Sequence, residues 1–332
     1  MHTGQSGEAR GSGPLLSIED LQTWFPIKRG FFSRKKEYIR AVDGVSLCLH
    51  AGETLGLVGE SGCGKTTLGR TLLGLEQATG GRMVFQNVVL NRIGKREMKR
   101  LRQGIQVIFQ DPVSSLNPRM SVMDIVTEGL VQFRRIEGSK MDHARRLVKE
   151  VGLSADAVYR YPHEFSGGQR QRINIARAVS LRPDFIICDE AVSALDVSIQ
   201  AQVLNLLIAL QERHQLSYLF ISHDLSVVSN IADRIAVMYM GQIVEMGKTA
   251  DIIHAPAHPY TRALIAAVPV PGQERLAGNK PIMGETPSAA SPPQGCRFHP
   301  RCPEATELCR KTPPRLRVFR DREVACHLCR PG

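Results

Sequence analysis

Short apolar runs alternate with helical patterns along the first 250 residues. The runs that have the length and composition of buried strands are residues 55–58, 105–109, 185–188 and 218–221. Between the last two runs, apolar residues recur at the spacing of one helix face, at Ile199, Val203, Leu206 and Leu210. Strands that alternate with helices predict an α/β fold with a mainly parallel sheet covered on both faces.

This regular pattern ends near His254. Two last apolar runs, 235–239 and 242–245, are joined at Met240-Gly241 and predict a closing hairpin. Beyond His254 the chain is rich in proline, carries five of its eight cysteines and loses periodicity. We therefore predict a main domain over residues 14–252 and a separate, irregular, cysteine-containing C-terminal extension over residues 253–332.

Composition is that of a globular protein with a sizeable core. Hydrophobic residues make up 42% of the 332 residues and aromatic residues 5%. No stretch approaches the run of about 18 apolar residues that a membrane-spanning helix needs. The first seven residues lack the basic end and apolar centre of a signal peptide. These features predict a protein of the cytosol.

The net charge of +11 permits more than one interpretation. Basic residues cluster at 92–102 and 315–322, among other places, and such clusters can contact nucleic acid or anionic lipid. A solvated surface is the simplest explanation for most of them. Because no recognised nucleic-acid-binding module accompanies the charge, we predict that the protein does not bind nucleic acid.

A phosphate-binding loop follows the first buried run. Residues 59–66 match the pattern G-x-x-x-x-G-K-[ST], with a predicted strand before them and a predicted helix after them. The backbone N–H groups of such a loop close around phosphate oxygens, Lys65 reaches the β- and γ-phosphates, and the Thr66 hydroxyl binds Mg²⁺. The predicted ATP-binding residues are Gly59, Ser61, Gly62, Cys63, Gly64, Lys65, Thr66 and Thr67.

Two acidic residues end the third buried run. Asp189 and Glu190 follow residues 185–188, so they are expected at the sheet edge beside the phosphates. Asp189 suits the Mg²⁺ shell together with Thr66, and Glu190 suits a general base that deprotonates the attacking water.

Two polar side chains follow other strands at the same edge. Gln110 comes directly after the run 105–109, and His223 follows the run 218–221. A lone histidine at a strand end is more often a surface residue, but ligands of α/β sheets bind where strands end. We therefore predict a γ-phosphate contact for His223, and for Gln110 a role in the Mg²⁺ site and in catalysis.

These motifs, in this order and with Phe165-Ser166-Gly167-Gly168-Gln169 between them, resemble the ATP-binding cassette of ABC transporters. The resemblance implies a P-loop cassette with an inserted helical subdomain at about residues 111–180. It also implies a head-to-tail dimer with two ATP molecules at the interface. The residues expected to reach the partner's ATP or to lie at that interface are Ser166, Gly168, Gln169 and Asp196. By its distance before the phosphate loop, Tyr38 is the candidate that stacks on adenine.

Further segments narrow the resemblance to the ATPases of oligopeptide and dipeptide importers, and within them to the second, F-type ATPase. For the importers they are residues 117–119, 198–202, 258–264, 296–303 and 325–327, and for the F-type ATPase they are residues 190–193. The resemblance implies a peripheral subunit at the cytoplasmic face of the plasma membrane. Its partners would be a second ABC ATPase, which is expected to be a different chain, two permeases and an extracytoplasmic solute-binding protein. The alternatives are a soluble ABC ATPase that acts on nucleic acid or ribosomes, and an importer of another solute such as nickel or glutathione.

Four cysteines of the extension form the last candidate site. In a reducing cytosol such a set binds metal more often than it forms disulfides. The resemblance suggests a 4Fe–4S cluster, and zinc is the alternative because His327 or Cys329 could complete a zinc site. The candidate ligands are Cys296, Cys302, Cys309 and Cys326.

Overall fold

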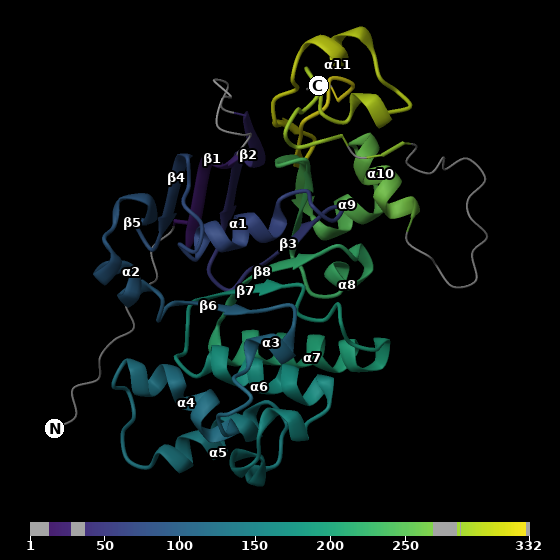
Figure 1. The fold of residues 1–332 in the computed structure, drawn as a ribbon. Helices are drawn as coiled ribbons and strands as arrows, with labels where there is room; N and C mark the ends of the chain where they lie inside the picture. The colour runs from purple at the N-terminus through teal and green to yellow at the C-terminus, as the bar shows by residue number, and fades with distance from the viewer. Residues whose placement is uncertain (1–12, 28–36, 268–283, 286, 330–332) are drawn as a thin grey trace, which may run out of the picture.

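A computed structural model describes residues 13–27, 37–267, 284–285 and 287–329. The first residues, on which the prediction about a signal peptide rests, lie outside this part of the chain. The described residues form two β-sheets, a layer of helices below them and a C-terminal lobe above them (Figure 1). Among the described residues, no helix is both long enough and apolar enough to cross a bilayer.

The main sheet has eight strands in the order β11-β12-β10-β9-β3-β8-β7-β6. Strands β9, β3, β8, β7 and β6 are parallel neighbours, and the other three strands of this sheet join them by antiparallel pairing. The bounds are β3 Thr54–Val58, β6 Ile105–Ile108, β7 Phe185–Asp189, β8 Ser217–Ser222, β9 Arg234–Tyr239, β10 Gln242–Lys248, β11 Arg317–Phe319 and β12 Arg322–Val324. The predicted strands and the closing hairpin are confirmed, with most ends within one residue of the predicted ones.

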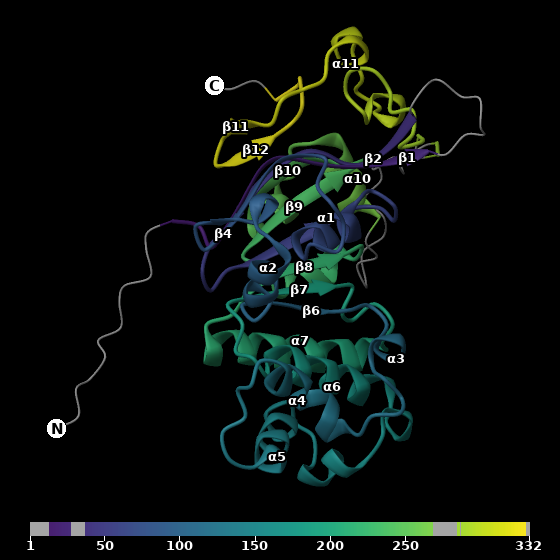
Figure 2. The ribbon, with the colours of Figure 1, turned by 60° about the vertical axis from the view of Figure 1, so that its left-hand side comes forward.

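A smaller antiparallel sheet lies against one face of the main sheet, with α1 beside both (Figure 2). Its order is β2-β1-β4-β5, with bounds β1 Leu16–Ile27, β2 Glu37–Leu49, β4 Gly80–Phe85 and β5 Val88–Val89. Leu68 and Leu72 of α1 (Lys65–Leu72) share one buried cluster with Leu57, Phe85 and other residues of both sheets. This burial fixes the start of α1 against the end of β3, which positions the loop between them.

The other face of the main sheet is covered by helices. The second buried cluster joins residues of α4, α5, α6, α7 and α8 to the sheet. The chain leaves the sheet after β6 and returns at β7, and the intervening helices form the lower lobe in Figure 1. The bounds are α2 Lys95–Leu101, α3 Pro112–Ser115, α4 Val122–Gln132, α5 Lys140–Glu150, α6 Gly167–Val179, α7 Val197–His214, α8 Leu225–Ser229, α9 Thr249–His254, α10 Pro259–Ala266 and α11 Glu307–Lys311.

The C-terminal extension is more regular than its sequence pattern indicates. Its hairpin β11–β12 pairs with β10 and lengthens the main sheet by two strands (Figure 2). The prediction of a wholly irregular extension is therefore wrong on this point. Strands of three residues are too short to produce a readable alternation of apolar and polar positions, so the sequence pattern gave no sign of them.

A buried charged network joins the extension to the sheet. Glu245 of β10 is fully buried, and its carboxylate accepts the N–H groups of Ala257 and His258 at 2.8 and 2.9 Å. The guanidinium of Arg322 in β12 lies 3.5 Å from the same carboxylate. Because a buried charge that loses its partner is costly, this network ties the extension to one position on the sheet.

Candidate functional site

The phosphate loop leaves the middle of the main sheet, where β3 lies between β8 and β9. Two of its glycines are required by close approach as well as by backbone conformation. Gly59 and Gly64 have φ of 157° and 111°, and a Cβ on either would lie about 2 Å from the carbonyl oxygen of Met238 or Ala41 (2.1 and 2.0 Å). Only glycine permits this packing, which closes the loop around the start of α1.

Lys65 lies inside this loop. Its side chain is 4% exposed, and its ammonium donates to the carbonyl oxygens of Gly59 at 2.8 Å and Glu60 at 3.0 Å. The loop carbonyls therefore hold the ammonium at the centre of a ring of backbone groups. A triphosphate offers stronger acceptors to the same ammonium because its oxygens carry full charges.

Thr66 and Asp189 come together from sequence positions far apart. The Thr66 hydroxyl donates to Asp189 Oδ1 at 3.2 Å, which links the start of α1 to the end of β7. Burial raises the pKa of Asp189, the Thr66 hydrogen bond opposes this rise, and the neighbouring Glu190 adds to it. A hydroxyl beside a carboxylate that burial destabilises in its charged form is a donor set that fits Mg²⁺.

Glu190 is the meeting point of three strand ends. Gln110 Nε2, after β6, donates to one carboxylate oxygen at 2.8 Å, and His223 Nδ1, after β8, lies 3.3 Å from the other. Glu190 itself has φ of 50°, a left-handed conformation that turns its side chain away from the path of β7. The predicted convergence of these three residues at one sheet edge is thus present. A cavity of about 400 Å³, lined in part by Gln110 and Asp189, opens beside them.

The segment 165–169 forms the start of α6. The Ser166 hydroxyl accepts the N–H of Gln169 at 3.4 Å, and the Gln169 side chain accepts the N–H of Ser166 at 3.0 Å, so the two residues form a capping box. Gly168 packs so closely on α7 that a Cβ would lie 2.5 Å from Ile199 Cγ2. An exposed helix start of this kind, with two glycines and therefore little side-chain bulk, can receive an anion from another chain.

Two more predicted site residues, Asp196 and Tyr38, lie outside the loop 59–66 and the segment 165–169. Asp196 is exposed at the start of α7, next to Val197, which is 83% exposed. Tyr38 lies on β2, three residues before Ala41, whose carbonyl touches Gly64. Its ring centroid is 6.1 Å from that of Trp24. Asp196 is therefore on a surface open to a partner, whereas Tyr38 is half-buried.

The extension reaches the phosphate loop, which the sequence pattern did not predict. The Tyr260 hydroxyl accepts the N–H of Glu60 at 2.9 Å, and Arg301 forms an ion pair with the Glu60 carboxylate at 2.8 Å. The residues are about 200 positions or more apart in sequence, and no local pattern relates them. The sequence indicated these regions only through the segments 258–264 and 296–303, which resemble oligopeptide importer ATPases.

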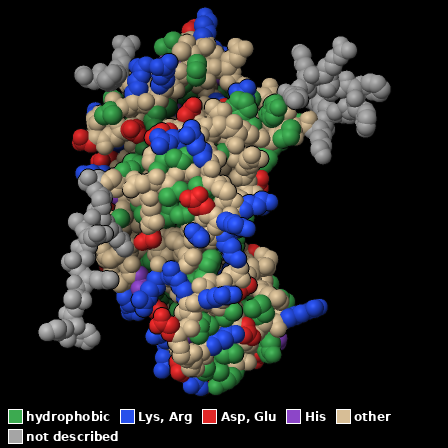
Figure 3. Space-filling view, turned by 90° about the vertical axis from the view of Figure 1, so that its left-hand side faces the viewer, with side chains coloured by type: hydrophobic (Ala, Val, Ile, Leu, Met, Phe, Trp, Pro, Cys, Tyr) green, Lys and Arg blue, Asp and Glu red, His purple; other side chains and the backbone are tan. Residues whose placement is uncertain are grey.

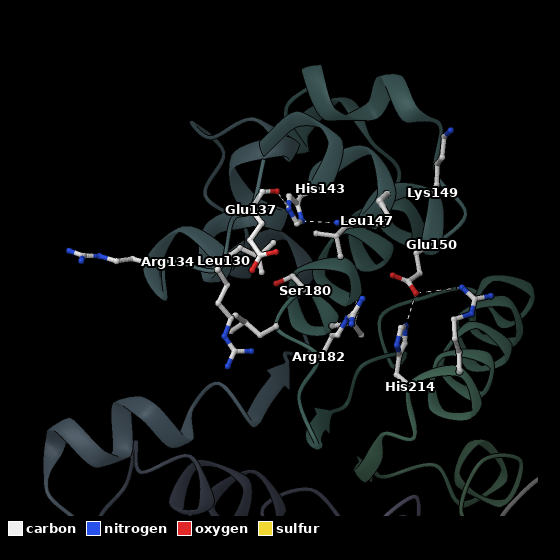
Figure 4. A pocket seen from close by; sticks show the side chains of 15 residues that line it. Leu130, Arg134, Glu137, His143, Leu147, Lys149, Glu150, Ser180, Arg182 and His214 are labelled. Carbon is white, nitrogen blue, oxygen red and sulfur yellow. Dashed lines mark hydrogen bonds and ion pairs between the residues drawn. The ribbon is translucent and has the colours of Figure 1, made fainter. Parts of the chain in front are cut away.

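A second cavity, of about 770 Å³, lies away from these residues (Figure 4). It opens between α4 and α5 and the C-terminal ends of α6 and α7, whereas Ser166 and Asp196 mark the opposite ends of the last two helices. Glu150 at the end of α5 contacts the end of α7, with His214 at 2.6 Å and Arg213 at 3.5 Å. The cavity therefore belongs to the junction of the helical layer and not to the phosphate loop.

Basic side chains do not gather into one stripe on the face seen in Figure 3. Lys and Arg are scattered over it from top to bottom and alternate with acidic and apolar side chains. A surface of this kind lacks the continuous basic groove with which proteins follow a nucleic-acid backbone.

The four predicted cysteine ligands lie in one lobe but do not form a metal site. Burial raises the pKa of Cys296 to about 11, and the neighbouring thiols of Cys302, Cys309 and Cys326 add to this rise. Among the described residues, however, no group of three or more cysteine, histidine or acidic side chains is arranged to hold a metal ion. All eight cysteines are reduced. The prediction of a 4Fe–4S cluster, or of zinc, is therefore not supported by this arrangement.

Comparisons with known proteins match the chain in two parts. The ABC transporter family matches residues 42–193, and the oligopeptide/dipeptide transporter C-terminal region matches residues 244–309. The oligopeptide transport ATP-binding protein OppF of Escherichia coli is 49% identical over 95% of this chain and 96% of its own length. AppF of Bacillus subtilis, also named an oligopeptide transport ATP-binding protein, is 47% identical over 95% of this chain and 97% of its own length.

Solved structures share the fold. The chain resembles cbiO1 of Clostridium perfringens, part of the transporter complex cbiONQ, with a TM-score of 0.62 and 24% identity over 73% of this chain and 91% of that one. It also resembles a dimeric, post-hydrolysis state of the ATP-binding cassette MJ0796 bound to ADP and Pi. There the TM-score is 0.61, with 25% identity over 70% of this chain and 98% of that one.

Proposed function

The chain belongs to the ABC transporter family, in the group that carries the oligopeptide/dipeptide transporter C-terminal region, and we propose that it powers a membrane importer of oligopeptides or dipeptides. It is an ATPase that couples ATP hydrolysis to transport. The observation that carries the peptide assignment is similarity over nearly the full chain, extension included, to oligopeptide transport ATP-binding proteins. The residue roles below are part of the same proposal.

ATP binds to the loop between β3 and α1. Lys65 exchanges the carbonyl oxygens of Gly59 and Glu60 for the β- and γ-phosphates, while the N–H groups of the loop hold the remaining phosphate oxygens. Thr66 and Asp189 would hold Mg²⁺, which would supply positive charge to the phosphates. Tyr38, on the strand beside the loop, stacks on the adenine.

Hydrolysis depends on Glu190. Its carboxylate accepts a proton from the attacking water, and Gln110 and His223, which contact its two oxygens, hold it in the orientation that this transfer requires. His223 also contacts the γ-phosphate. Because Gln110 lies directly before α3, it links the hydrolytic site to the helical layer.

A second cassette completes the site. The exposed start of α6, with Ser166, Gly168 and Gln169, binds the γ-phosphate of the ATP held by the partner, and Asp196 lies at the interface. The dimeric structure of the similar cassette MJ0796 supports the proposal that two cassettes pair. We propose the finer point that the partner is a different chain, in line with the F-type resemblance.

Ser166→Arg is expected to impair the ATP site of the partner without changing the ATP site of this chain. The added side chain blocks the helix start that receives the partner's phosphate, so hydrolysis of the ATP held by the partner should fall by about a hundredfold, as for loss of one donor to a reacting oxyanion. ATP binding to this chain's own loop should be unchanged. Ser139→Arg is the matched control, because Ser139 caps α5 in the same way. Equal ATPase rates for the two variants would exclude this role of Ser166.

Two permeases and an external solute-binding protein are the further partners, and the chain lies at the cytoplasmic face of the plasma membrane. Phe109 and Val113, on either side of Gln110, are 37% and 58% exposed. Apolar side chains exposed next to a residue of the hydrolytic site suit a surface that docks on a membrane subunit. Closure of the cassettes on ATP would move this surface and the permeases with it.

Reconstitution tests the transport assignment. Vesicles that contain the chain, its cognate permeases and its second ATPase should take up a labelled oligopeptide only with ATP inside and binding protein outside. Uptake of nickel or glutathione but not of peptide would correct the solute. Salt-sensitive binding to nucleic acid without binding to permeases would favour the soluble ABC ATPase, an alternative that the full-length relatives do not favour.

The finer cofactor proposal concerns Cys296, Cys302, Cys309 and Cys326. What supports a 4Fe–4S cluster, or zinc, is the resemblance together with the electrostatic coupling of the four thiols. The described arrangement does not fit such a group as it stands, so no step of transport is assigned to it. Iron, sulfide and zinc content of the purified full-length protein tests the proposal, and a colourless protein with one bound zinc would exclude the cluster.

A further inference from the structure

The C-terminal extension contacts the phosphate loop at Glu60 through both a guanidinium and a hydroxyl group. The guanidinium of Arg301 contacts both carboxylate oxygens of this residue, Nη1 to Oε2 at 2.8 Å and Nη2 to Oε1 at 3.0 Å. The Arg301 side chain is 8% exposed and that of Glu60 is 26% exposed. A bidentate pair in such a shielded place is geometrically specific and stronger than a surface ion pair.

Tyr260 holds the backbone of the same residue. Its hydroxyl oxygen accepts the N–H of Glu60 at 2.9 Å, and the side chain is fully buried. Burial raises the pKa of Tyr260 well above its ordinary value, so the group is a neutral hydroxyl. The extension therefore fixes both the main chain and the side chain of one position in the loop.

A second contact steadies the strand beside the loop. Arg297 forms a buried ion pair with Asp43 and donates to the carbonyl oxygen of Met240. Asp43 lies on β2 close to Ala41, whose carbonyl touches Gly64 of the loop. Because Arg297 and Arg301 lie within five residues of each other, one short segment of the extension contacts both the loop, at Glu60, and the neighbouring strand β2, at Asp43.

The negative charge of Glu60 makes its contact with Arg301 important for nucleotide binding. Glu60 is part of a loop that closes around a triphosphate, so its carboxylate lies close to several negative charges. Without a partner it would repel the nucleotide and compete with the phosphates for Lys65, whose ammonium already contacts the Glu60 carbonyl at 3.0 Å. The Arg301 guanidinium contacts both carboxylate oxygens and neutralises their charge.

We propose that Arg301 and Tyr260 of the C-terminal extension are positioning residues for nucleotide binding, and that the extension sets the ATP affinity of the phosphate loop through Glu60. The proposal rests on the proposed function, since it assigns regulation of the same ATP site. It gives the extension a role within this chain that is independent of the transported solute.

The test is a double-substitution cycle on the purified full-length chain, read out as the Kd for a fluorescent ATP analogue. Arg301→Ala should raise Kd by about tenfold or more, because it removes the bidentate contact to the Glu60 carboxylate. Glu60→Gln removes the negative charge that Arg301 neutralises, so adding it to Arg301→Ala should restore most of the lost affinity. Tyr260→Phe should raise Kd by about threefold, the size expected for one neutral hydrogen bond.

Arg262→Ala is the matched control. Arg262 also lies in the extension and pairs with an acid, Glu304, but it is 45% exposed and does not contact the loop, so its Kd should be unchanged. The kcat at saturating ATP, measured with the partner cassette, should stay within about twofold for Arg301→Ala, since Glu190 and its contacts are untouched.

Three results would overturn the proposal. They are an unchanged Kd for Arg301→Ala, the same rise in Kd for Arg262→Ala, and no recovery of affinity in the double variant. If Arg301→Ala does not fold, Arg301→Lys keeps the charge, loses the bidentate contact and should give a smaller rise in Kd; no rise would count against the proposal. Failure of the unmodified chain to bind ATP would instead refute the proposed function.

Discussion

Glu190→Gln is expected to reduce ATP hydrolysis by about a hundredfold or more, which is the typical contribution of a general base. The amide keeps the shape of the carboxylate, and its oxygen can still accept the Gln110 amide N–H that now lies 2.8 Å away. The amide cannot accept a proton from water. ATP binding should therefore persist, because Lys65, Thr66 and Asp189 are unchanged.

Two measurements check this expectation. Phosphate release by the assembled cassettes gives the rate, and binding of a fluorescent ATP analogue gives the affinity. Glu212→Gln, on the exposed side of α7, is the matched control and should leave both quantities unchanged. If Glu190→Gln retained undiminished hydrolysis, another group would have to act as the base and the convergence of Gln110 and His223 would need another explanation.

Lys65→Ala is expected to abolish activity by a different route. The substitution removes the side-chain ammonium that the phosphate loop encloses. Its contacts with the carbonyl oxygens of Gly59 and Glu60 are lost as well. A hydrogen bond to a charged group is worth about 1.5–3 kcal/mol, so the loss of one such phosphate contact should raise Kd for ATP by about 10- to 150-fold. Binding should fail before chemistry is reached.

Titration with the same ATP analogue separates Lys65→Ala from Glu190→Gln. The first variant should show weak binding, and the second should show nearly normal binding with little turnover. Lys95→Ala removes an exposed lysine of α2 and should match the unmodified chain. Tight ATP binding by Lys65→Ala would refute the assignment of the loop 59–66 as the triphosphate site.

The main sheet and the convergence at its edge could be predicted from sequence because both depend on local signals. Buried runs of four to six residues, with polar residues directly after them, define strands and place Gln110, Asp189 and His223 at one edge once the strands are parallel. The spacing of the loop residues fixes Lys65 and Thr66 in the same way. The contacts of Gln110 and His223 with Glu190 follow from this geometry.

The extension could not be predicted to the same degree, because long-range contacts determine its structure. Its strand β12 pairs with β10 and β11 pairs with β12, and the buried Arg322 is held by Glu245 and by the carbonyl oxygens of Asp251 and Ala255. The contact of Arg301 with Glu60 has no local signal at all. The set of four cysteines and the family resemblance pointed to a metal group, but neither determines how the side chains are oriented.

The hairpin β11–β12 also determines how the molecule ends its main sheet. Without it, β10 would present unpaired N–H and C=O groups along its open side, a surface on which another chain can form intermolecular strands. With it, the outermost strand is β11, only three residues long, flanked by Arg315 and Arg320. Short, cationic margins of this kind discourage such pairing, so the hairpin protects this edge of the main sheet against intermolecular strand formation.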